Sequence, residues 1–281
     1  MKKIIPILLL SIAFNINAQN FAGKATYKTS RKSNFKFGGN QKGVSDKMQE
    51  DLRKRMEKMN QKTFILNFDK FTSTYKEDVK LADPKKPSMG GMRVMAVSIG
   101  GSGSAGVYYK NTKENRFVNQ TEIMGKRFLV KDKLPKQDWV LTTEKKNIGN
   151  YTCYKATYTR EVENTKMSFV NGESKEEKVK ETIVTTAWYT PQVPVSNGPD
   201  NFQGLPGLIL EINDGKRMMV CTEIELTPNN TITIEEPKKG KSVSQKKFDK
   251  ISREKSKELM EKFKSRKGVD IGNGTTIKFG G

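Results

Sequence analysis

A corner rich in glycine and proline constrains the fold of this 281-residue chain more than any other feature. It reads GLPGL, from Gly204 to Leu208, and stands directly in front of an apolar run. Pro206 fixes φ at about −65° and Gly207 accepts a positive φ, which are the demands of a type II turn at its two central positions. A phosphate-binding glycine loop would need a following helix and a Lys-Ser/Thr pair, and this corner has neither. We therefore predict a structural turn that leads into a β-strand.

The apolar run after the corner is followed by a reversal of the chain. Leu208–Ile212 is the predicted strand, and Asp214-Gly215 suits a two-residue type I′ hairpin turn before a second apolar run. This loop predicts the facing pairs Ile212 with Arg217, Leu210 with Met219, and Leu208 with Cys221. Because side chains alternate along a strand, one apolar face then carries Leu208, Leu210, Met219 and Cys221.

The rest of the chain predicts mainly strands. Short β-branched and aromatic runs are separated by Asn, Gly, Asp or Pro at intervals typical of antiparallel sheets. The runs are FAGKATYKTSR, TFILNFDKFTSTYKED, VYYKN, RFVNQTEIMG, KRFLVKDKL, WVLTTEKKNI, YTCYKATYTREV and ETIVTTAWYT. The polar stretch 163–180 is predicted to be an excursion between two longer strands. The expected fold class is mainly β, a β-rich α+β fold built on a curved antiparallel sheet or half-barrel.

Two segments have the pattern of amphipathic helices. In Val44–Lys62, after the first strand, apolar residues recur every three or four positions and mark one helical face. We expect this helix to pack on its own domain; the alternative is a membrane-surface helix. In the lysine-rich tail 237–281, Ser244 is the predicted N-cap of a charged helix and Gly268 its predicted stop, and we expect this tail to be partly mobile. The span 81–106 is a flexible Gly/Ser/Met-rich connection.

The first residues have the features of a secretory signal peptide, predicted over 1–18. Lys2 and Lys3 precede an apolar run too short to span a bilayer comfortably, and Ala18 suits cleavage. A single β-rich domain over 19–236 is expected to follow. The sequence therefore predicts an exported protein, periplasmic or secreted, that is neither an integral membrane protein nor a lipoprotein.

The net charge of +21 favours anionic partners such as lipopolysaccharide, an acidic glycan or a membrane surface. Export argues against nucleic acid as the natural partner. The alternative is that the excess charge only keeps the surface soluble, since the lysines are spread along the chain, often beside glutamates, and are not gathered into one patch.

The chain contains no histidine, which excludes Ser-His-Asp triads, Cys-His pairs and the ordinary zinc sites. Carboxylate-based or lysine-based catalysis survives this exclusion. However, Asp138, Asp200 and Glu211, near Trp139 and the glycine corner, have no spacing that requires acid/base roles. We predict no catalytic residue and no cofactor.

Sulfur-bearing residues give two weaker signals. Met89, Met92 and Met95 are three apart, and thioethers are ligands for Cu(I), although loose apolar packing is the preferred explanation. Cys153 and Cys221 are the only cysteines, and an even pair in an exported protein predicts a disulfide. The alternative is two buried free thiols.

The stretch AWYTPQVPVSNGPDNFQGLPGLILEI, from Ala187 to Ile212, resembles the signature of the GLPGLI family of exported Bacteroidetes proteins. The upstream IGNYTCYKATY and the lysine-rich tail with ISREKSKELMEKF are also similar to that family. The resemblance implies a bacterial exported protein and supplies no activity and no catalytic residue. The residues of the family motif in this chain are Gly204, Leu205, Pro206, Gly207, Leu208 and Ile209.

A second likeness concerns the fold alone. The stretch from Trp139 to Ala156 is similar to the curved antiparallel sheets of periplasmic lipid carriers, in which a helix covers an apolar cavity. By this analogy the segment Val44–Lys62 would be the covering helix.

The favoured function is a non-enzymatic binding or carrier protein for an apolar ligand such as lipid, or for an anionic one. Trp188, Tyr189 and Phe202 are the candidates to line a groove. The alternative is a protein-interaction accessory of the cell envelope, for example of an outer-membrane protein, with the Pro-rich segment and the charged tail as contact surfaces. A carboxylate-based enzyme is the least favoured.

Overall fold

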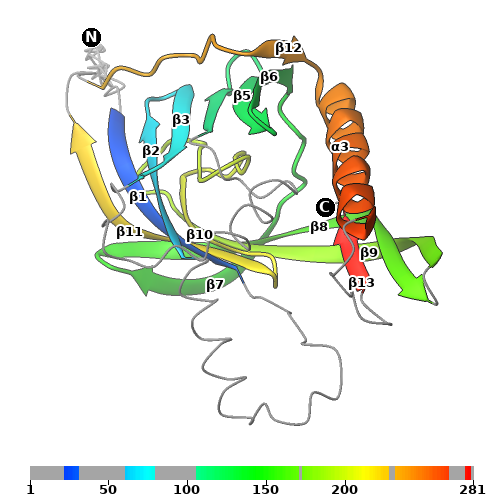
Figure 1. Cartoon of the computed structure of the whole chain (residues 1–281). Helices are drawn as coiled ribbons and strands as arrows, with labels where there is room; N and C mark the ends of the chain where they lie inside the picture. The colour runs from blue at the N-terminus through cyan, green and yellow to red at the C-terminus, as the bar shows by residue number, and fades with distance from the viewer. Residues whose placement is uncertain are drawn as a thin grey trace, which may run out of the picture.

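The computed structural model describes residues 22–31, 61–79, 106–170, 173–227, 232–265 and 276–279. Its strands form one large curved sheet that is not closed into a barrel, as Figure 1 shows. The strand order is β12-β6-β5-β4-β3-β2-β1-β11-β10-β9-β8-β13, and β7 also pairs with β8. Neighbouring strands are antiparallel except for β12 and β6, which are parallel. The mainly β fold class and the curved sheet are confirmed.

The elements follow the predicted runs closely. The first strands are β1 (Ala22–Arg31), β2 (Lys62–Phe68), β3 (Thr72–Glu77), β4 (Val107–Asn111), β5 (Arg116–Ile123) and β6 (Lys126–Lys133). The next are β7 (Val140–Ile148), β8 (Tyr151–Val170), β9 (Glu173–Thr190), β10 (Leu208–Asn213) and β11 (Arg217–Thr227). The chain continues with β12 (Lys241–Val243), α3 (Gln245–Ser265) and β13 (Thr276–Phe279). The short strands β12 and β13 are not predicted by the sequence.

The predicted excursion at 163–180 is wrong, because these residues extend β8 and β9 into one long hairpin. The two strands pair continuously from Tyr154↔Tyr189 to Val170↔Glu173. Oppositely charged side chains pair across the ladder, as Glu163 and Lys178 do at 2.8 Å. Such cross-strand pairs stabilise a sheet, so a polar composition is compatible with continued pairing here.

The hairpin of β10 and β11 differs in register from the prediction. Ile212 faces Met219, and Asn213 faces Met218, so Ile212 does not face Arg217. β10 ends at Asn213 and β11 begins at Arg217, so the turn contains three residues, 214–216, where the sequence predicts two. Four residues are predicted to share one face of the hairpin. Leu208, Leu210 and Cys221 do lie in one core cluster, whereas Met219 lies in another.

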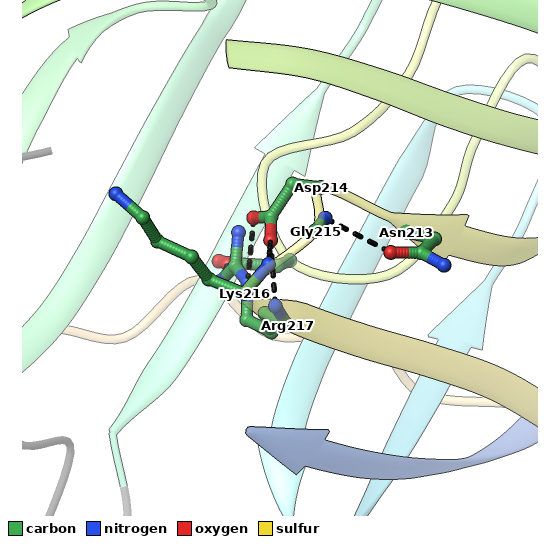
Figure 2. A network of polar contacts seen from close by, with 6 residues as sticks. Asn213, Asp214, Gly215, Lys216 and Arg217 are labelled. Atoms are coloured by element: carbon green, nitrogen blue, oxygen red, sulfur yellow. Dashed lines mark hydrogen bonds and ion pairs between the residues drawn. The ribbon is translucent and has the colours of Figure 1, made fainter. Parts of the chain in front are cut away.

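Side-chain hydrogen bonds explain the longer turn, as Figure 2 shows. The Asp214 carboxylate accepts from the amides of Lys216 at 3.1 Å and Arg217 at 2.6 Å. The Asn213 side-chain oxygen accepts from the amide of Gly215 at 2.9 Å. Short polar side chains that bond to nearby amides stabilise turns in this way. Hydrophobic periodicity does not reveal such bonds.

The charged C-terminal helix is confirmed as α3. Ser244 caps it, because its hydroxyl accepts from the amide of Lys247 at 3.4 Å and its carbonyl from that of Phe248 at 2.9 Å. Phe248 and Ile251 pack against an apolar cluster that includes Phe128 of β6. The helix is described as far as Ser265, and its predicted stop at Gly268 lies outside the described residues.

Several predictions lie outside the described residues. These are the signal peptide 1–18, the helix Val44–Lys62 except for its last two residues, nearly all of the connection 81–106, and Met89, Met92 and Met95. Lys62, the predicted end of that helix, is the first residue of β2. Within the part of the chain that is described, no helix has both the length and the apolar character needed to cross a membrane.

Candidate functional site

The glycine corner belongs to a segment that lies against the inner side of the curved sheet. This interior segment, residues 191–207, connects β9 to β10 and runs inside the curve in Figure 1. Val193 and Val195 pack in one core cluster with residues of β1–β3, and Phe202 and Leu205 pack in a second with residues of β9 and β10. All four side chains are at most 5% exposed. The chain therefore occupies with its own residues the place where a carrier would hold its ligand.

The corner is tighter than the predicted type II turn. The amide of Gly207 donates to the carbonyl of Leu205 at 2.8 Å, which closes a three-residue turn around Pro206. The amide of Leu208 donates to Val193 at 2.9 Å, whereas a type II turn would bond it to Leu205. The predicted turn type is therefore wrong, and the predicted strand from Leu208 is confirmed.

The two glycines of the motif serve different needs. Gly204 has a φ of 93°, a conformation that other residues rarely adopt. Gly207 is needed for space, because a Cβ there would lie 2.2 Å from the carbonyl oxygen of Thr190. The motif thus allows the interior segment to press directly onto the backbone at the end of β9.

A buried lysine holds this segment to the sheet. Lys110, in β4, is 0% exposed, and its Nζ donates to the carbonyls of Gly198 at 2.6 Å and Phe202 at 2.9 Å. Burial lowers the pKa of Lys110 to about 7, and the nearby Asp200 carboxylate opposes that shift. Two charge-assisted bonds to main-chain carbonyls compensate part of the cost of burying an ammonium group. Lys110 therefore fixes the position of the segment.

A partly exposed ion pair lies near Lys110. Arg217 Nη1 is 2.8 Å from Asp200 Oδ2, and the side chains are 27% and 30% exposed. Asp200 has a φ of 52°, in the left-handed region that Asp tolerates better than most residues. Burial raises the pKa of Tyr75, and Asp200 adds to that shift. The buried Tyr75 hydroxyl has no hydrogen-bond partner within the described structure.

This arrangement restrains the chain more than it favours chemistry. The amine of Lys110 is partly neutral at pH 7, as a nucleophilic lysine must be, but it is fully buried and bonded to two carbonyls. Trp139 Nε1 also donates to the Gln203 carbonyl of this segment at 2.8 Å, and Tyr27 Oη donates at 2.7 Å to the Ile209 carbonyl in β10, which directly follows the segment. Sequence reasoning missed Lys110, because its partners lie 88 and 92 residues away.

The three residues predicted to line a groove are divided between two clusters. Tyr189 and Phe202 are buried together in the cluster of Leu205 and Ile209. Trp188 packs at the edge of the other cluster, because neighbours in a strand point to opposite faces. The structure therefore joins two of these side chains in the core and places the third elsewhere.

The two cysteines meet in one cluster without a bond. Cys153 and Cys221 are buried and free, and they share the cluster that also contains Leu208. Burial raises the pKa of Cys153 to about 11 and that of Cys221 to about 12. In the structure the two cysteines are therefore buried free thiols, which is the alternative to the predicted disulfide.

The carboxylates near the corner occupy three separate ion pairs. Asp200 pairs with Arg217, Glu211 with Lys146 at 2.7 Å and Asp138 with Lys136 at 2.8 Å. Among the described residues, no three Cys, Asp or Glu side chains gather as metal ligands would.

Lysines distant in the sequence come together at one end of the sheet. The β4–β5 turn meets the end of β6, where the amide of Leu134 donates to Asn115 at 3.1 Å. The amide of Thr112 donates to Phe71 at 2.8 Å, so the β2–β3 turn is adjacent. The start of α3 joins them through the amide of Gln245, which donates to Asp132 at 3.0 Å. The exposed lysines of this end, here called the basic rim, are Lys70, Lys113, Lys133, Lys246 and Lys247.

Acidic residues lie among the lysines of the basic rim and are engaged in local bonds: Glu114 pairs with Arg116, and Asp249 accepts from the side-chain amide of Gln245. Asp69 accepts from the amides of Phe71 and Thr72, and Asp132 accepts from the amides of Lys133 and Gln245. Their oxygens thus shape the turns, while the rim lysines extend into solvent. The sequence shows these lysines as scattered, and only the fold gathers them.

Comparison with known proteins gives a family match over part of the chain. Residues 139–211 match the model of a family described as Protein of unknown function (Porph_ging). The matched residues run from the tryptophan before β7 to β10 and include the interior segment. No curated protein matches the chain.

Solved structures are matched at low identity. Two of them are "Structure of PNGF-II in C2 space group", at 14% identity and a TM-score of 0.46, and "Structure of PNGF-II in P21 space group", at 15% and 0.43. The matches cover 84% and 85% of this chain but 33% and 34% of the other. The chain thus spans about a third of the length of these proteins.

Proposed function

We propose that this chain is an exported, non-enzymatic binding protein of the GLPGLI family that attaches to an anionic component of the cell envelope through the basic rim. The observation that carries the proposal is the gathering of lysines from β2–β3, β4–β5, β6 and α3 at one end of the sheet. The periplasmic or secreted location follows from the predicted signal peptide 1–18.

The interior favours a surface ligand over an enclosed one. The inner side of the sheet is occupied by Val193, Val195, Phe202 and Leu205, each at most 5% exposed. A lipid held there would have to displace the interior segment and the bonds of Lys110. Of the two ligand classes that the sequence supports, apolar and anionic, the structure therefore favours the anionic one.

The physical mechanism is electrostatic attraction between the rim and a negatively charged surface. Each lysine near such a surface contributes about 1 kcal/mol, and the attraction falls off within a Debye length of about 8 Å at physiological salt. Flexible lysine side chains suit phosphate or sulfate groups of variable spacing. Binding is therefore expected to weaken steeply as salt concentration rises.

A charge-reversal experiment tests the proposal. The rim variant carries Lys133→Glu, Lys246→Glu and Lys247→Glu, and a control variant carries the same charge change at exposed lysines of β1, β7 and β9, namely Lys28→Glu, Lys145→Glu and Lys180→Glu. Binding to dextran sulfate and to phosphatidylglycerol vesicles is measured by sedimentation. We expect about a 100-fold loss for the rim variant, from roughly 1 kcal/mol per lysine, and a much smaller loss for the control. Equal losses, or a wild type that binds neither probe, contradict the proposal.

A second candidate, a protein-interaction accessory, is favoured by an uncharged row across the other end of the sheet. Five strands place one residue each in register, and Val184 lies two residues before the β9 member of this row. Val140 is 64% exposed, Val184 54% and Met218 38%. The row consists of Val140, Thr157, Thr186, Asn213 and Met218. If this function holds, Val140→Lys with Val184→Lys abolishes crosslinking to one defined envelope protein, whereas the rim variant retains it.

A further inference from the structure

An exposed aromatic side chain stands at the tip of the β2–β3 turn. Phe71 is 41% exposed. The Asp69 carboxylate fixes the turn, because it accepts from the amide of Phe71 at 2.8 Å, from the amide of Thr72 at 2.6 Å and from the Thr72 hydroxyl at 2.6 Å. The turn is rigid, and it presents an apolar ring to solvent.

The neighbouring turn supports the same tip. The carbonyl of Phe71 accepts from the amide of Thr112 at 2.8 Å and from its hydroxyl at 3.0 Å. These bonds join the β2–β3 turn to the β4–β5 turn through main-chain atoms. The Phe71 ring is thus held in position by contacts that do not involve the ring itself.

Two ammonium groups flank the ring. Lys70 Nζ lies 5.3 Å and Lys113 Nζ 5.8 Å from the centroid of the Phe71 ring. At an exposed site such cation–π contacts contribute only about 0.5–1 kcal/mol, so they do not account for an aromatic displayed at a turn. An apolar ring between cations matches the interface of an anionic bilayer, where rings enter the acyl boundary and lysines extend toward the phosphates.

The tip also belongs to the basic rim. The β4–β5 turn, which carries Lys113, is bonded to the residue after β6 through Leu134 and Asn115. Phe71 is therefore surrounded by the same charges that the proposed function assigns to an anionic partner. A soluble polyanion would use the lysines alone, whereas a bilayer would use the lysines and the ring.

We propose that Phe71 is a membrane anchor: the basic rim binds an anionic lipid bilayer, the Phe71 ring inserts at the headgroup boundary, and Lys70 and Lys113 contact lipid phosphates. This inference rests on the proposed function and narrows its partner to a lipid surface. The rim lysines supply attraction at a distance, and the ring supplies apolar area that is buried only on contact.

The test compares Phe71→Ala with Met124→Ala. Met124 is similarly exposed, at 44%, but it lies in the β5–β6 turn at the opposite end of these strands. Sedimentation with vesicles of phosphatidylcholine and phosphatidylglycerol, and binding to dextran sulfate, are measured for each variant. We expect Phe71→Ala to weaken vesicle binding about fivefold to tenfold and to leave dextran sulfate binding unchanged, since only the bilayer buries the ring. Met124→Ala is expected to change neither.

A second measurement follows the ring directly. In Phe71→Trp, vesicles that contain brominated lipid are expected to quench more fluorescence than they do in the wild type, whose tryptophans are Trp139 and Trp188. Equal quenching, or full vesicle binding by Phe71→Ala, overturns the anchor. A wild type that binds dextran sulfate but no vesicle also overturns the anchor and leaves the proposed function standing. A wild type that binds neither overturns both.

Discussion

Lys110 and the lysines of the basic rim have the same side chain in opposite surroundings. Lys110 is 0% exposed and donates to two carbonyls of the interior segment. The rim lysines, such as Lys246 and Lys247, are exposed at the start of α3. One position uses an ammonium group to fix the chain, and the other displays ammonium groups to solvent, where we propose that an anionic partner binds.

The difference suggests that stability and the proposed binding depend on different lysines of this molecule. The interior segment is held by bonds from Lys110 of β4 and from Trp139, and Tyr27 of β1 bonds to β10 directly after it. Changes there are expected to affect the free energy of unfolding. Changes at the rim are expected to affect affinity and to leave stability nearly unchanged. The predictions below test this division, from the largest expected effect on stability to the smallest.

The largest effect is expected at the glycine that touches the sheet backbone. In Gly207→Ala the new Cβ would lie 2.2 Å from the Thr190 carbonyl oxygen, so the interior segment must shift. We expect a loss of about 3 kcal/mol or more in the free energy of unfolding, measured by urea denaturation. The matched control is Gly215→Ala, at a φ of 81° with open space around it. It costs only the backbone strain of about 1–2 kcal/mol. Equal losses for the two variants would mean that the interior segment does not pack closely against the backbone at Thr190.

The second prediction concerns Lys110→Met. Two buried carbonyls lose their donor, and we expect a loss of about 2 kcal/mol at pH 7. Burial lowers the pKa of Lys110 from 10.5 to about 7 in the folded state. Between these values the unfolded state binds more protons, so the contribution of Lys110 to stability rises with pH. The loss caused by Lys110→Met is therefore expected to be larger at pH 9 than at pH 7. Identical pH profiles for wild type and variant would contradict the buried position.

The fold was more accessible from the sequence than the site, for physical reasons that particular residues show. Period-2 alternation is a local signal, and it predicts β1 to β7 and the strand from Leu208. The length of the β10–β11 turn depends on the side chains of Asn213 and Asp214, which bond to nearby amides. The length of the β8–β9 hairpin depends on cross-strand pairs such as Glu163 with Lys178. Neither effect has a signature in hydrophobic periodicity.

The candidate site depends on contacts between distant segments. Lys110 looks like any strand lysine until the interior segment, about 90 residues later, lies over it. The rim gathers lysines from turns and from α3, and no single segment contains them. Phe71 likewise acquires its second lysine from the next hairpin. Net charge could therefore suggest the proposed anionic partner from the sequence, but not the place where that charge gathers.

A smaller effect is expected from a single neutral hydrogen bond. Trp139→Phe removes the bond from Nε1 to the Gln203 carbonyl and leaves the nearby Phe202 and Tyr158 rings with an aromatic neighbour. We expect a loss of about 1 kcal/mol in the free energy of unfolding, below that of Lys110→Met, because neutral bonds contribute less than charge-assisted ones. Urea denaturation of both variants in parallel gives the order. The reverse order would show that Lys110 contributes little to holding the interior segment against the sheet.

The smallest effect on stability is expected at the rim, together with a large effect on binding. The variant with Lys133→Glu, Lys246→Glu and Lys247→Glu changes exposed side chains, each of which is expected to alter the free energy of unfolding by less than about 0.5 kcal/mol. Its affinity for phosphatidylglycerol vesicles falls about 100-fold by the same electrostatic reasoning as before. Lys110→Met, assayed at a temperature where it is fully folded, is expected to keep the affinity of the wild type. If Lys110→Met also loses vesicle binding while its fold is intact, the interior segment takes part in recognition. In that case the separation between Lys110, which supports stability, and the rim lysines, which support binding, does not hold. The position of the interior segment would then determine the shape of the binding surface.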